Sequence, residues 1–446
     1  MKKVAVLGGG ASGLAAAIAA GRCGADVTVF EASDRVGKPI LATGNGRCNF
    51  SNADIMSSDY NRPDFVQAAM NTLPPEDVLL FFADAGLLFR QEDEGRMYPY
   101  SNKANTVVDV LRMCAAEAGV VEQCGVAAKS VEEAGGRWRV VFEDGTSDEF
   151  DSVIVAVGGG PAKGLVPSDI RDKKTHPVLA PLKTDTKAIK GLNGTRVKAR
   201  LYLDDDGKVL SEAWMDVVDP EVEQAYQGPE TYGEVLFREY GISGIAVFDL
   251  SRMVQPGNTV YIDFLPDMDP QEKVDYIYGQ VMTHPNRTAA QIMSGILPSN
   301  VARAIVVAAG LNPDDVILAE QEVVVLAMVS ESFSLEVKGV ANPKQAQVTR
   351  GGYNVKDFDP STMECLSHAG LYAAGEALDI DARCGGYNLH WAWTSGILAG
   401  VAAAGGSMLD GVPLSDAMAS AMAGNAAAGA ETGVYVSLPD GSQRED

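Results

Sequence analysis

The sequence predicts an α/β protein with a parallel sheet at its centre and an antiparallel module inserted into the sheet domain. Apolar runs at residues 4–7 and 153–157 lead directly into glycines, as in buried parallel strands that end in tight turns. From about residue 184, strand-like segments alternate with Asp-Gly, Gly-Pro and Pro-Gly turns, which is typical of antiparallel structure. The 446 residues are too many for one ordinary core, so we expect two or three domains.

The opening unit has the order strand, glycine loop, helix, strand and acid. Residues 4–7 predict the first strand, and residues 8–13 (GGGASG) predict a loop with the spacing G-x-G-x-x-G. Residues 14–20 predict a helix with a small-residue face, and residues 25–30 predict a second strand that leads into Glu31. Every part occurs where the motif requires it, so a dinucleotide site explains the pattern better than an isolated glycine turn.

Each residue of this motif has a physical role in that interpretation. Gly8 allows the tight turn, Gly10 lets the backbone approach a pyrophosphate, and Gly13 lets the helix pack close to the strand. The helix N-terminus offers free N–H groups to the phosphates. Glu31 can accept hydrogen bonds from both hydroxyls of an adenosine ribose, which disfavours a 2′-phosphate and leaves FAD or NAD as the dinucleotide.

A long loop rich in glycine and asparagine follows at residues 32–52. It carries the cations Lys38 and Arg47, together with several side-chain amides and hydroxyls. The loop is either a surface connection or a ligand-binding loop. We favour the ligand-binding loop, because long loops beside a nucleotide crevice usually have a function.

The remaining part of the first domain contains helices and further strands. Residues 63–88 and 104–119 have helical periodicity, and residues 120–141 predict a hairpin or meander. Residues 151–160 form a second apolar strand that ends in glycines, and prolines interrupt the stretch after it. We therefore interpret this segment as a strand of the first sheet whose turn passes the cofactor, in preference to a separate NAD domain.

The inserted module combines strands with a helical part. Residues 270–311 carry apolar residues at helical spacing and predict a small helical cap, in which we interpret His284 as a surface residue. The strands that we predict before this cap are residues 197–203, 209–215, 234–237, 245–250 and 259–264.

The last informative block repeats the pattern of a strand and a glycine turn. Residues 346–353 predict a strand that enters a glycine turn, and residues 370–379 contain a strand that ends in Gly-Glu. Residues 384–389 (CGGYNL) then lead into a helix at residues 390–404. Beyond residue 406 the chain is rich in Ala, Gly and Ser, and we expect its last fifteen or so residues to be unstructured.

Composition and charge exclude several function classes. The net charge of −24 opposes binding to nucleic acid or to anionic membranes, and the longest apolar runs are too short for a membrane span. The six cysteines form no C-x-x-C pair, which indicates neither a zinc site nor a dithiol. We expect a reduced, cytoplasmic protein without a metal site; the sequence leaves its oligomeric state open.

Five segments together make the chain resemble one family of flavoproteins. They are the opening unit and the segments GNGRCN (residues 44–49), GISG (241–244), QVTRGG (347–352) and AGE…CGGYNLHWA (374–392). This set resembles the NAD(P)/FAD-dependent oxidoreductase family that includes bacterial aminoacetone oxidase and the clostridial flavoprotein of bile-acid 7α-dehydroxylation. The resemblance covers about residues 1–406.

The resemblance implies a glutathione-reductase-like FAD-binding Rossmann domain that is discontinuous in sequence. A β-rich module and a helical subdomain would be inserted between its two parts. The expected domains are residues 1–184 with 337–406 for FAD binding, 185–268 with 312–336 for the β-rich module, 269–311 for the helical subdomain, and 407–446 for a partly disordered tail.

The cofactor implied by the resemblance is FAD, with NAD(P)H as a transient reductant. A helix N-terminus after residue 385 would stabilise negative charge at the flavin edge. Val126 is expected to contact adenine through its backbone. The predicted cofactor residues are Gly8, Gly10, Ala11, Ser12, Gly13, Glu31, Ala32, Lys38, Gly44, Asn45, Gly46, Arg47, Cys48, Asn49, Val126, Gly158, Gly375, Glu376, Gly386, Asn388 and Leu389.

The expected reaction is the NAD(P)H-driven reduction of a C=C bond in an enone-like small molecule, including one of steroid or bile-acid type. The alternatives are an oxidase of a small amine such as aminoacetone, which would release hydrogen peroxide, and a flavoprotein that acts on RNA. The catalytic residue stays unassigned, with Tyr387 and His390 as candidates for the proton donor. We interpret Cys48 and Cys384 as structural cysteines, because no spacing places them as a redox pair.

Overall fold

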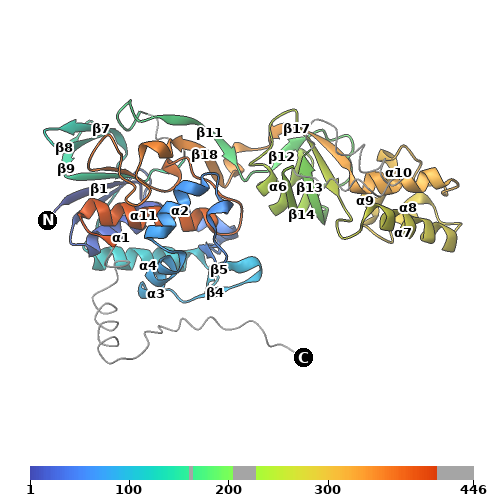
Figure 1. The fold of residues 1–446 in the computed structure, drawn as a ribbon, viewed down its shortest axis with the longest axis horizontal. Helices are drawn as coiled ribbons and strands as arrows, with labels where there is room; N and C mark the ends of the chain where they lie inside the picture. The colour runs from blue at the N-terminus through green and yellow to red at the C-terminus, as the bar shows by residue number, and fades with distance from the viewer. Residues whose placement is uncertain (160–163, 204–227, 409–446) are drawn as a thin grey trace, which may run out of the picture. The chain divides into compact units, whose positions relative to one another are not determined.

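The computed structural model describes residues 1–159, 164–203 and 228–408 and divides the chain into two compact units (Figure 1). The first unit comprises Met1–His176 and the chain from Val348 onward, and the second is Pro177–Gln347. The boundaries expected at residues 184 and 337 fall inside strands of the second unit. A discontinuous first unit with an insertion is the organisation that the sequence predicts.

The first unit is built on a five-stranded sheet in which every neighbouring pair of strands is parallel. The strand at residues 152–155 pairs directly with the first strand, so the prediction that this segment belongs to the first sheet is confirmed. In spatial order the strands are β19 (Leu371–Ala373), β10 (Ser152–Val155), β1 (Lys3–Leu7), β2 (Asp26–Glu31) and β6 (Val121–Cys124).

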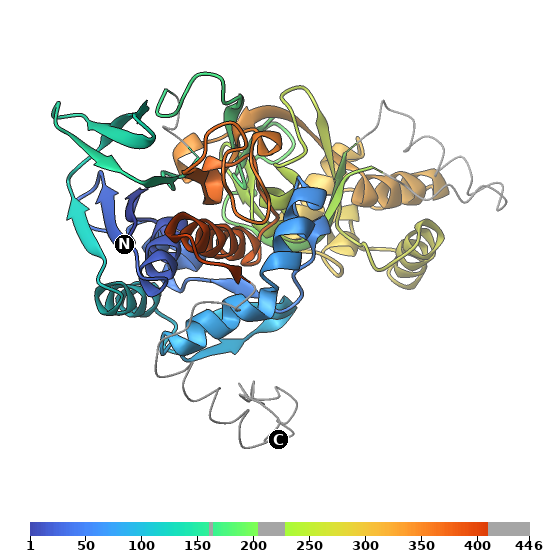
Figure 2. The same cartoon turned by 60° about the vertical axis from the view of Figure 1, so that its left-hand side comes forward.

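Two helices from opposite ends of the chain pack tightly together in this unit. They are α1 (Ala11–Arg22) and α11 (Tyr387–Ala404), which lie side by side in Figures 1 and 2. Small residues permit the approach, since a Cβ atom added at Gly396 would lie 2.4 Å from the carbonyl oxygen of Ser12. Helix α11 therefore touches the glycine loop that follows the first strand.

Smaller elements complete the first unit. Residues 63–88 form two helices, and the second begins at the Pro74-Pro75 pair as the sequence predicts. The meander turns at Gly135-Gly136. The elements are α2 (Pro63–Thr72), α3 (Pro75–Asp84), α4 (Ala104–Glu117), β3 (Ser51–Asn52), β4 (Phe89–Gln91), β5 (Arg96–Pro99), β7 (Ala128–Ala134), β8 (Arg137–Phe142), β9 (Ser147–Phe150), and the paired strands β11 (Asp172–Val178) and β18 (Val348–Tyr353).

The second unit is a closed barrel with helices attached. The barrel order is β12 (Leu182–Thr184), β15 (Gly241–Ser243), β14 (Glu230–Arg238), β13 (Arg196–Leu203), β16 (Thr259–Asp263) and β17 (Phe333–Val340). The helices are α6 (Ile245–Leu250), α7 (Pro270–Thr283), α8 (Ala289–Met293), α9 (Ser299–Ala308) and α10 (Glu320–Glu331).

Two of the strands predicted for this module are not strands of the described structure. The strand predicted at residues 245–250 is wrong, because this apolar run forms helix α6 after a left-handed turn at Gly244 (φ 107°). The strand predicted at residues 209–215 lies outside the described residues.

Each unit has its own hydrophobic core, so each can be described as a folding unit in its own right.

Candidate cofactor site

The carboxyl ends of the five parallel strands carry groups that the sequence singles out. Gly8 follows β1, Glu31 ends β2, and Val126 comes shortly after β6. Gly158 comes after β10, and Gly375 with Glu376 comes after β19. Because the strands are parallel, these groups share one edge of the sheet, where open α/β sheets bind their ligands.

The glycine loop is tightly packed at two positions and open at the third. A Cβ atom would lie 2.4 Å from the Ala156 carbonyl oxygen at Gly8, and 1.8 Å from the Gly8 carbonyl oxygen at Gly13. At Gly10, which caps α1 without a side-chain hydrogen bond, an added Cβ would meet no atom within 4 Å. The helix N-terminus is therefore open where a pyrophosphate would lie, and the loop fits a dinucleotide.

Glu31 holds the glycine loop in place through its carboxylate. Its Oε2 accepts the N–H of Gly9 at 2.7 Å, and its Oε1 accepts the N–H of Ser33 at 2.7 Å. The N–H of Val126 donates to the carbonyl oxygen of Glu31 at 3.0 Å. An adenine contact by Val126 would therefore use its carbonyl oxygen.

Two segments that are far apart in the sequence meet at the other end of the site. Asn52 Nδ2 donates to the carbonyl oxygen of Gly385 at 2.9 Å across 333 residues of chain. Ser51 Oγ and His390 Nδ1 are 2.9 Å apart, and Trp393 Nε1 donates to the carbonyl oxygen of Phe50 at 2.8 Å. The chain directly after GNGRCN thus packs on the CGGYNL loop and the start of α11.

The contact between these segments is close, and it leaves one buried polar atom without a partner. Gly385 and Gly386 have φ angles of 128° and 101°, and a Cβ atom at Gly386 would lie 2.2 Å from the Ser51 carbonyl oxygen. The side-chain oxygen of Asn49 is buried there without a hydrogen-bond partner. A buried acceptor of this kind calls for a donor, so the loop fits a polar ring such as that of a flavin.

Several predicted side chains are engaged elsewhere. Lys38 is exposed and pairs with Asp34 at 3.1 Å. Arg47 donates to Glu92 at 2.5 Å and to Asn102 at 2.7 Å. The amide of Asn388 is bonded on both sides to the backbone of Ala382, at 2.8 and 2.9 Å. Contacts of these three residues with a cofactor would need their backbone or a rearranged side chain.

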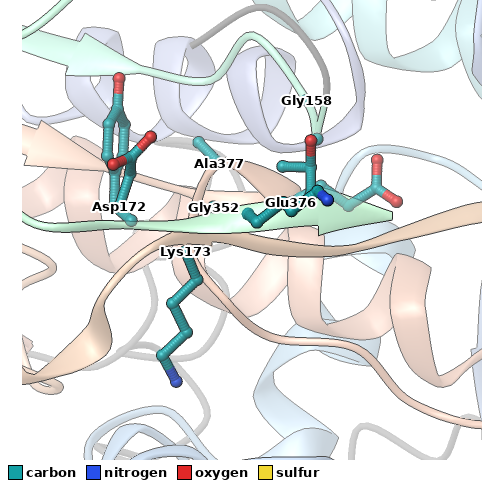
Figure 3. Close-up of a pocket in the computed structure, with 10 residues that line it drawn as sticks. Gly158, Asp172, Lys173, Gly352, Glu376 and Ala377 are labelled. Atoms are coloured by element: carbon teal, nitrogen blue, oxygen red, sulfur yellow. The ribbon is translucent and has the colours of Figure 1, made fainter. Parts of the chain in front are cut away.

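Glu376 lies in the wall of a cavity of about 330 Å³ (Figure 3). Its Oε1 accepts the N–H of Thr349 at 2.8 Å, and its carboxylate also accepts the N–H of Gly159. Burial raises the pKa of this carboxyl, and these two N–H groups oppose the shift. The cavity is lined by Gly158, Gly159, Asp172, Lys173, Lys174, Thr175, Gly352, Tyr353, Glu376 and Ala377.

The contribution of β11 to this cavity was not predicted from the sequence. Asp172 and Lys173 project from opposite faces of the strand, as Figure 3 shows. The strand is polar and has no glycine signature, so nothing in its composition indicates a site. In β18 the Gly-Gly pair at residues 351 and 352 does indicate an unusual backbone. Both glycines adopt positive φ angles in the structure.

The structure distinguishes the two candidates for the proton donor. His390 is fully buried, and burial lowers its pKa to about 3, so its ring is neutral at physiological pH. Burial raises the pKa of Tyr387, whose hydroxyl accepts a hydrogen bond from Arg383 at 2.7 Å. Cys48 and Cys384 form no disulfide, and burial raises the pKa of Cys48 to about 12.

Among the described residues, no group of three or more His, Cys, Asp or Glu side chains has the geometry of a metal site. Within the same part of the chain, no helix combines the length and the apolar character that crossing a bilayer requires.

A parallel sheet with a glycine loop at its first strand and a second glycine loop that begins α11 defines a Rossmann-type FAD-binding fold. The chain belongs to the family described as HI0933-like protein Rossmann domain, whose model matches residues 2–402. It is an FAD-dependent oxidoreductase of this family, which confirms the resemblance seen in the sequence.

Named relatives match nearly the whole chain. A 3-dehydro-bile acid delta(4,6)-reductase of Clostridium scindens is 32% identical over 91% of this chain and 99% of its own length. A ribosomal RNA dihydrouridine synthase of Haemophilus influenzae is 28% identical over 87% of this chain and 95% of its own length. A solved flavocytochrome c3 fumarate reductase is 16% identical with a TM-score of 0.42, over 91% of this chain and 78% of that one.

Proposed function

We propose that the protein reduces a C=C bond conjugated to a carbonyl group in a small molecule, with FAD as the resident cofactor and NAD(P)H as the reductant. The observation that carries this proposal is the match to the clostridial reductase, which extends over 99% of that protein. The match includes the inserted unit as well as the FAD-binding unit, which supports an activity that uses both units.

The proposal assigns separate roles to the two ends of the site. The open N-terminus of α1 would bind the pyrophosphate, and Glu31 would bind the adenosine ribose. Glu376 would hold the ribityl hydroxyls from the wall of the cavity. When bound, the flavin supplies the hydride chemistry. The N-terminus of α11 would stabilise negative charge beside it.

The cavity at β11 and β18 supports a substrate site beside the cofactor. It contains the predicted cofactor residues Gly158 and Glu376 as well as Tyr353 and the charged residues Asp172 and Lys173. Apolar and polar groups thus lie together in one concave space, as in sites for small organic substrates. We assign to this cavity the part of the substrate that lies away from the reacting C=C bond.

The test begins with the absorbance spectrum of the purified protein. We expect a flavin spectrum, its bleaching by NADH or NADPH in anaerobic stopped flow, and its return on mixing with a steroid enone. A protein that stays colourless after incubation with FAD, or a flavin that neither nicotinamide reduces, contradicts the proposal. Peroxide release on adding aminoacetone in air would instead favour an oxidase.

A second candidate function is the reduction of a base in RNA, which the name of the relative from Haemophilus influenzae suggests. The overall charge is −24, but residues 183–198 of the second unit carry four exposed lysines. Asp185 is the single acidic residue of this stretch. The lysines are Lys183, Lys187, Lys190 and Lys198. RNA binding that weakens steeply with salt, and weakens further when these lysines become glutamines, would favour this candidate.

A further inference from the structure

We propose that Tyr387 is the proton donor of the reduction, and that Arg383 and Asp59 position its hydroxyl and stabilise the phenolate. This assignment rests on the proposed function. It concerns the second half of the reaction, after the hydride has been delivered. The support is a chain of contacts that runs from the glycine loop of the cofactor site to the surface.

The ring of Tyr387 is fixed against the glycine loop. Tyr387 is the first residue of α11, and a Cβ atom at Gly385 would lie 2.8 Å from its Cε2 atom. Its carbonyl oxygen accepts a hydrogen bond from the hydroxyl of Tyr60 at 2.9 Å. The loop against which the ring packs also receives Asn52 and the unpartnered oxygen of Asn49. The ring is therefore fixed against the loop that we assign to the flavin.

The hydroxyl of Tyr387 meets a cation that reaches solvent. Arg383 Nη2 donates to the hydroxyl oxygen at 2.7 Å, and its guanidinium carbon lies 4.7 Å from the centre of the ring. Arg383 Nε donates in turn to Asp59 Oδ1 at 2.9 Å. The Asp59 side chain is 7% exposed and that of Arg383 is 49% exposed. A well-buried carboxylate thus orients a guanidinium that faces water on its other side.

These contacts suit the chemistry of a proton donor. The hydride adds to the β-carbon of the enone, and the π electrons of the C=C bond move toward the carbonyl group. The O–H bond of Tyr387 then breaks and a C–H bond forms at the α-carbon. The two electrons come from NAD(P)H through FAD. The phenolate is stabilised by the positive charge of Arg383 and regains a proton from water.

Other acids of the described site fit this role less well. His390 is neutral and fully buried, and one ring nitrogen is occupied by Ser51. The carboxylate of Glu376 accepts backbone N–H groups from Thr349 and Gly159, which favour its ionised form. Tyr387 combines a phenol that is protonated at neutral pH with a cation placed to stabilise its conjugate base.

The test compares the two half-reactions of Tyr387→Phe with those of the wild type. We expect unchanged FAD content and unchanged reduction by NAD(P)H, but a 10²- to 10⁴-fold slower reoxidation by the enone. The matched control is Tyr372→Phe, because Tyr372 of β19 is also buried but its hydroxyl pairs with Glu364 and not with an arginine. This control should reoxidise at the wild-type rate.

A second pair of variants covers the case in which Tyr387→Phe loses FAD. Arg383→Gln should slow reoxidation and shift its pH profile, whereas Arg383→Lys should restore much of the rate. Two results would overturn the assignment of Tyr387 and leave the proposed function intact. One is equal rates of flavin reoxidation in the wild type and Tyr387→Phe, and the other is a pH profile that Arg383→Gln leaves unchanged. A wild type that reduces no enone refutes the proposed function instead.

Discussion

At the scale of single residues, His368 has a carboxylate at each nitrogen of its ring. Its Nδ1 lies 2.8 Å from Glu133 Oε1, and its Nε2 lies 2.9 Å from Asp169 Oδ2. Only the charged imidazolium can donate to both carboxylates at once. The contact joins strand β7 to the segment between Gly158 and β11.

The stability of the protein should therefore depend on the protonation of His368. Burial lowers its pKa, but the two carboxylates outweigh burial and raise the pKa above 6.5. The stabilisation is thus complete below pH 6.5 and is lost as the pH rises through the pKa of the folded protein. Urea unfolding from pH 5.5 to 9 should show this decline, by up to about 1 kcal/mol.

The control for this prediction is a pair of glutamine variants. His368→Gln should unfold with a flatter pH dependence than the wild type over this range. His176→Gln changes an exposed histidine of β11 and should keep the wild-type slope. An unchanged slope in His368→Gln would contradict the prediction.

Cys48 should be chemically inert although it lies within a cofactor motif. It is fully buried, and burial raises its pKa to about 12, so little thiolate exists at pH 8. Iodoacetamide should leave Cys48 unmodified in the native protein and alkylate it in urea. Peptide mass mapping checks both states, and rapid native alkylation would show that the loop opens.

At the scale of elements, the contact between α1 and α11 depends on glycine. A Cβ atom at Gly400 would lie 2.2 Å from the carbonyl oxygen of Ala16. Gly400→Ala should therefore lower the free energy of unfolding by about 1–3 kcal/mol. Gly279→Ala is the matched control in α7, where an added Cβ meets nothing within 4 Å, and it should stabilise by about 0.5–1 kcal/mol. Urea midpoints of both variants measure the difference.

The elements differ in how well the sequence predicts them. Residues 4–31 were predictable because strand, loop, helix and acid each have a distinct pattern. Residues 245–250 were not, since a short apolar run is compatible with a strand or a helix and its neighbours decide. The partners of Arg47 are Glu92 and Asn102, which lie 45 and 55 residues further along the chain. Side-chain directions of this kind depend on the folded structure.

At the scale of the whole molecule, the two units should respond differently to FAD. Every predicted cofactor residue lies in the first unit, and each unit has its own core. A ligand at 100 times its Kd stabilises the state that binds it by about 2.7 kcal/mol. Hydrogen exchange monitored by mass spectrometry should therefore slow in α1 and α11 when FAD is added to the apoprotein. Equal slowing in β13 and β14 would contradict this.

The candidate site was predicted in outline because its glycines mark the ends of strands. The cavity was not predicted, since Asp172 and Lys173 belong to a polar strand whose place depends on its pairing with β18. A glycine in the sequence can mark a tight turn or a close approach of the backbone. The residues that line a cavity depend instead on packing between segments that are distant in sequence.

The pairing of β11 with β18 also bears on how such proteins diversify. The chain leaves the first unit after His176 and returns at Val348, and Gly351 of β18 packs against Lys174 of β11. The two ends of the insertion are therefore neighbours, so the 177–347 segment has the form of an exchangeable cassette. Replacing the segment at these two junctions would leave the sequence of the cofactor loops unchanged, because all of them lie in the first unit.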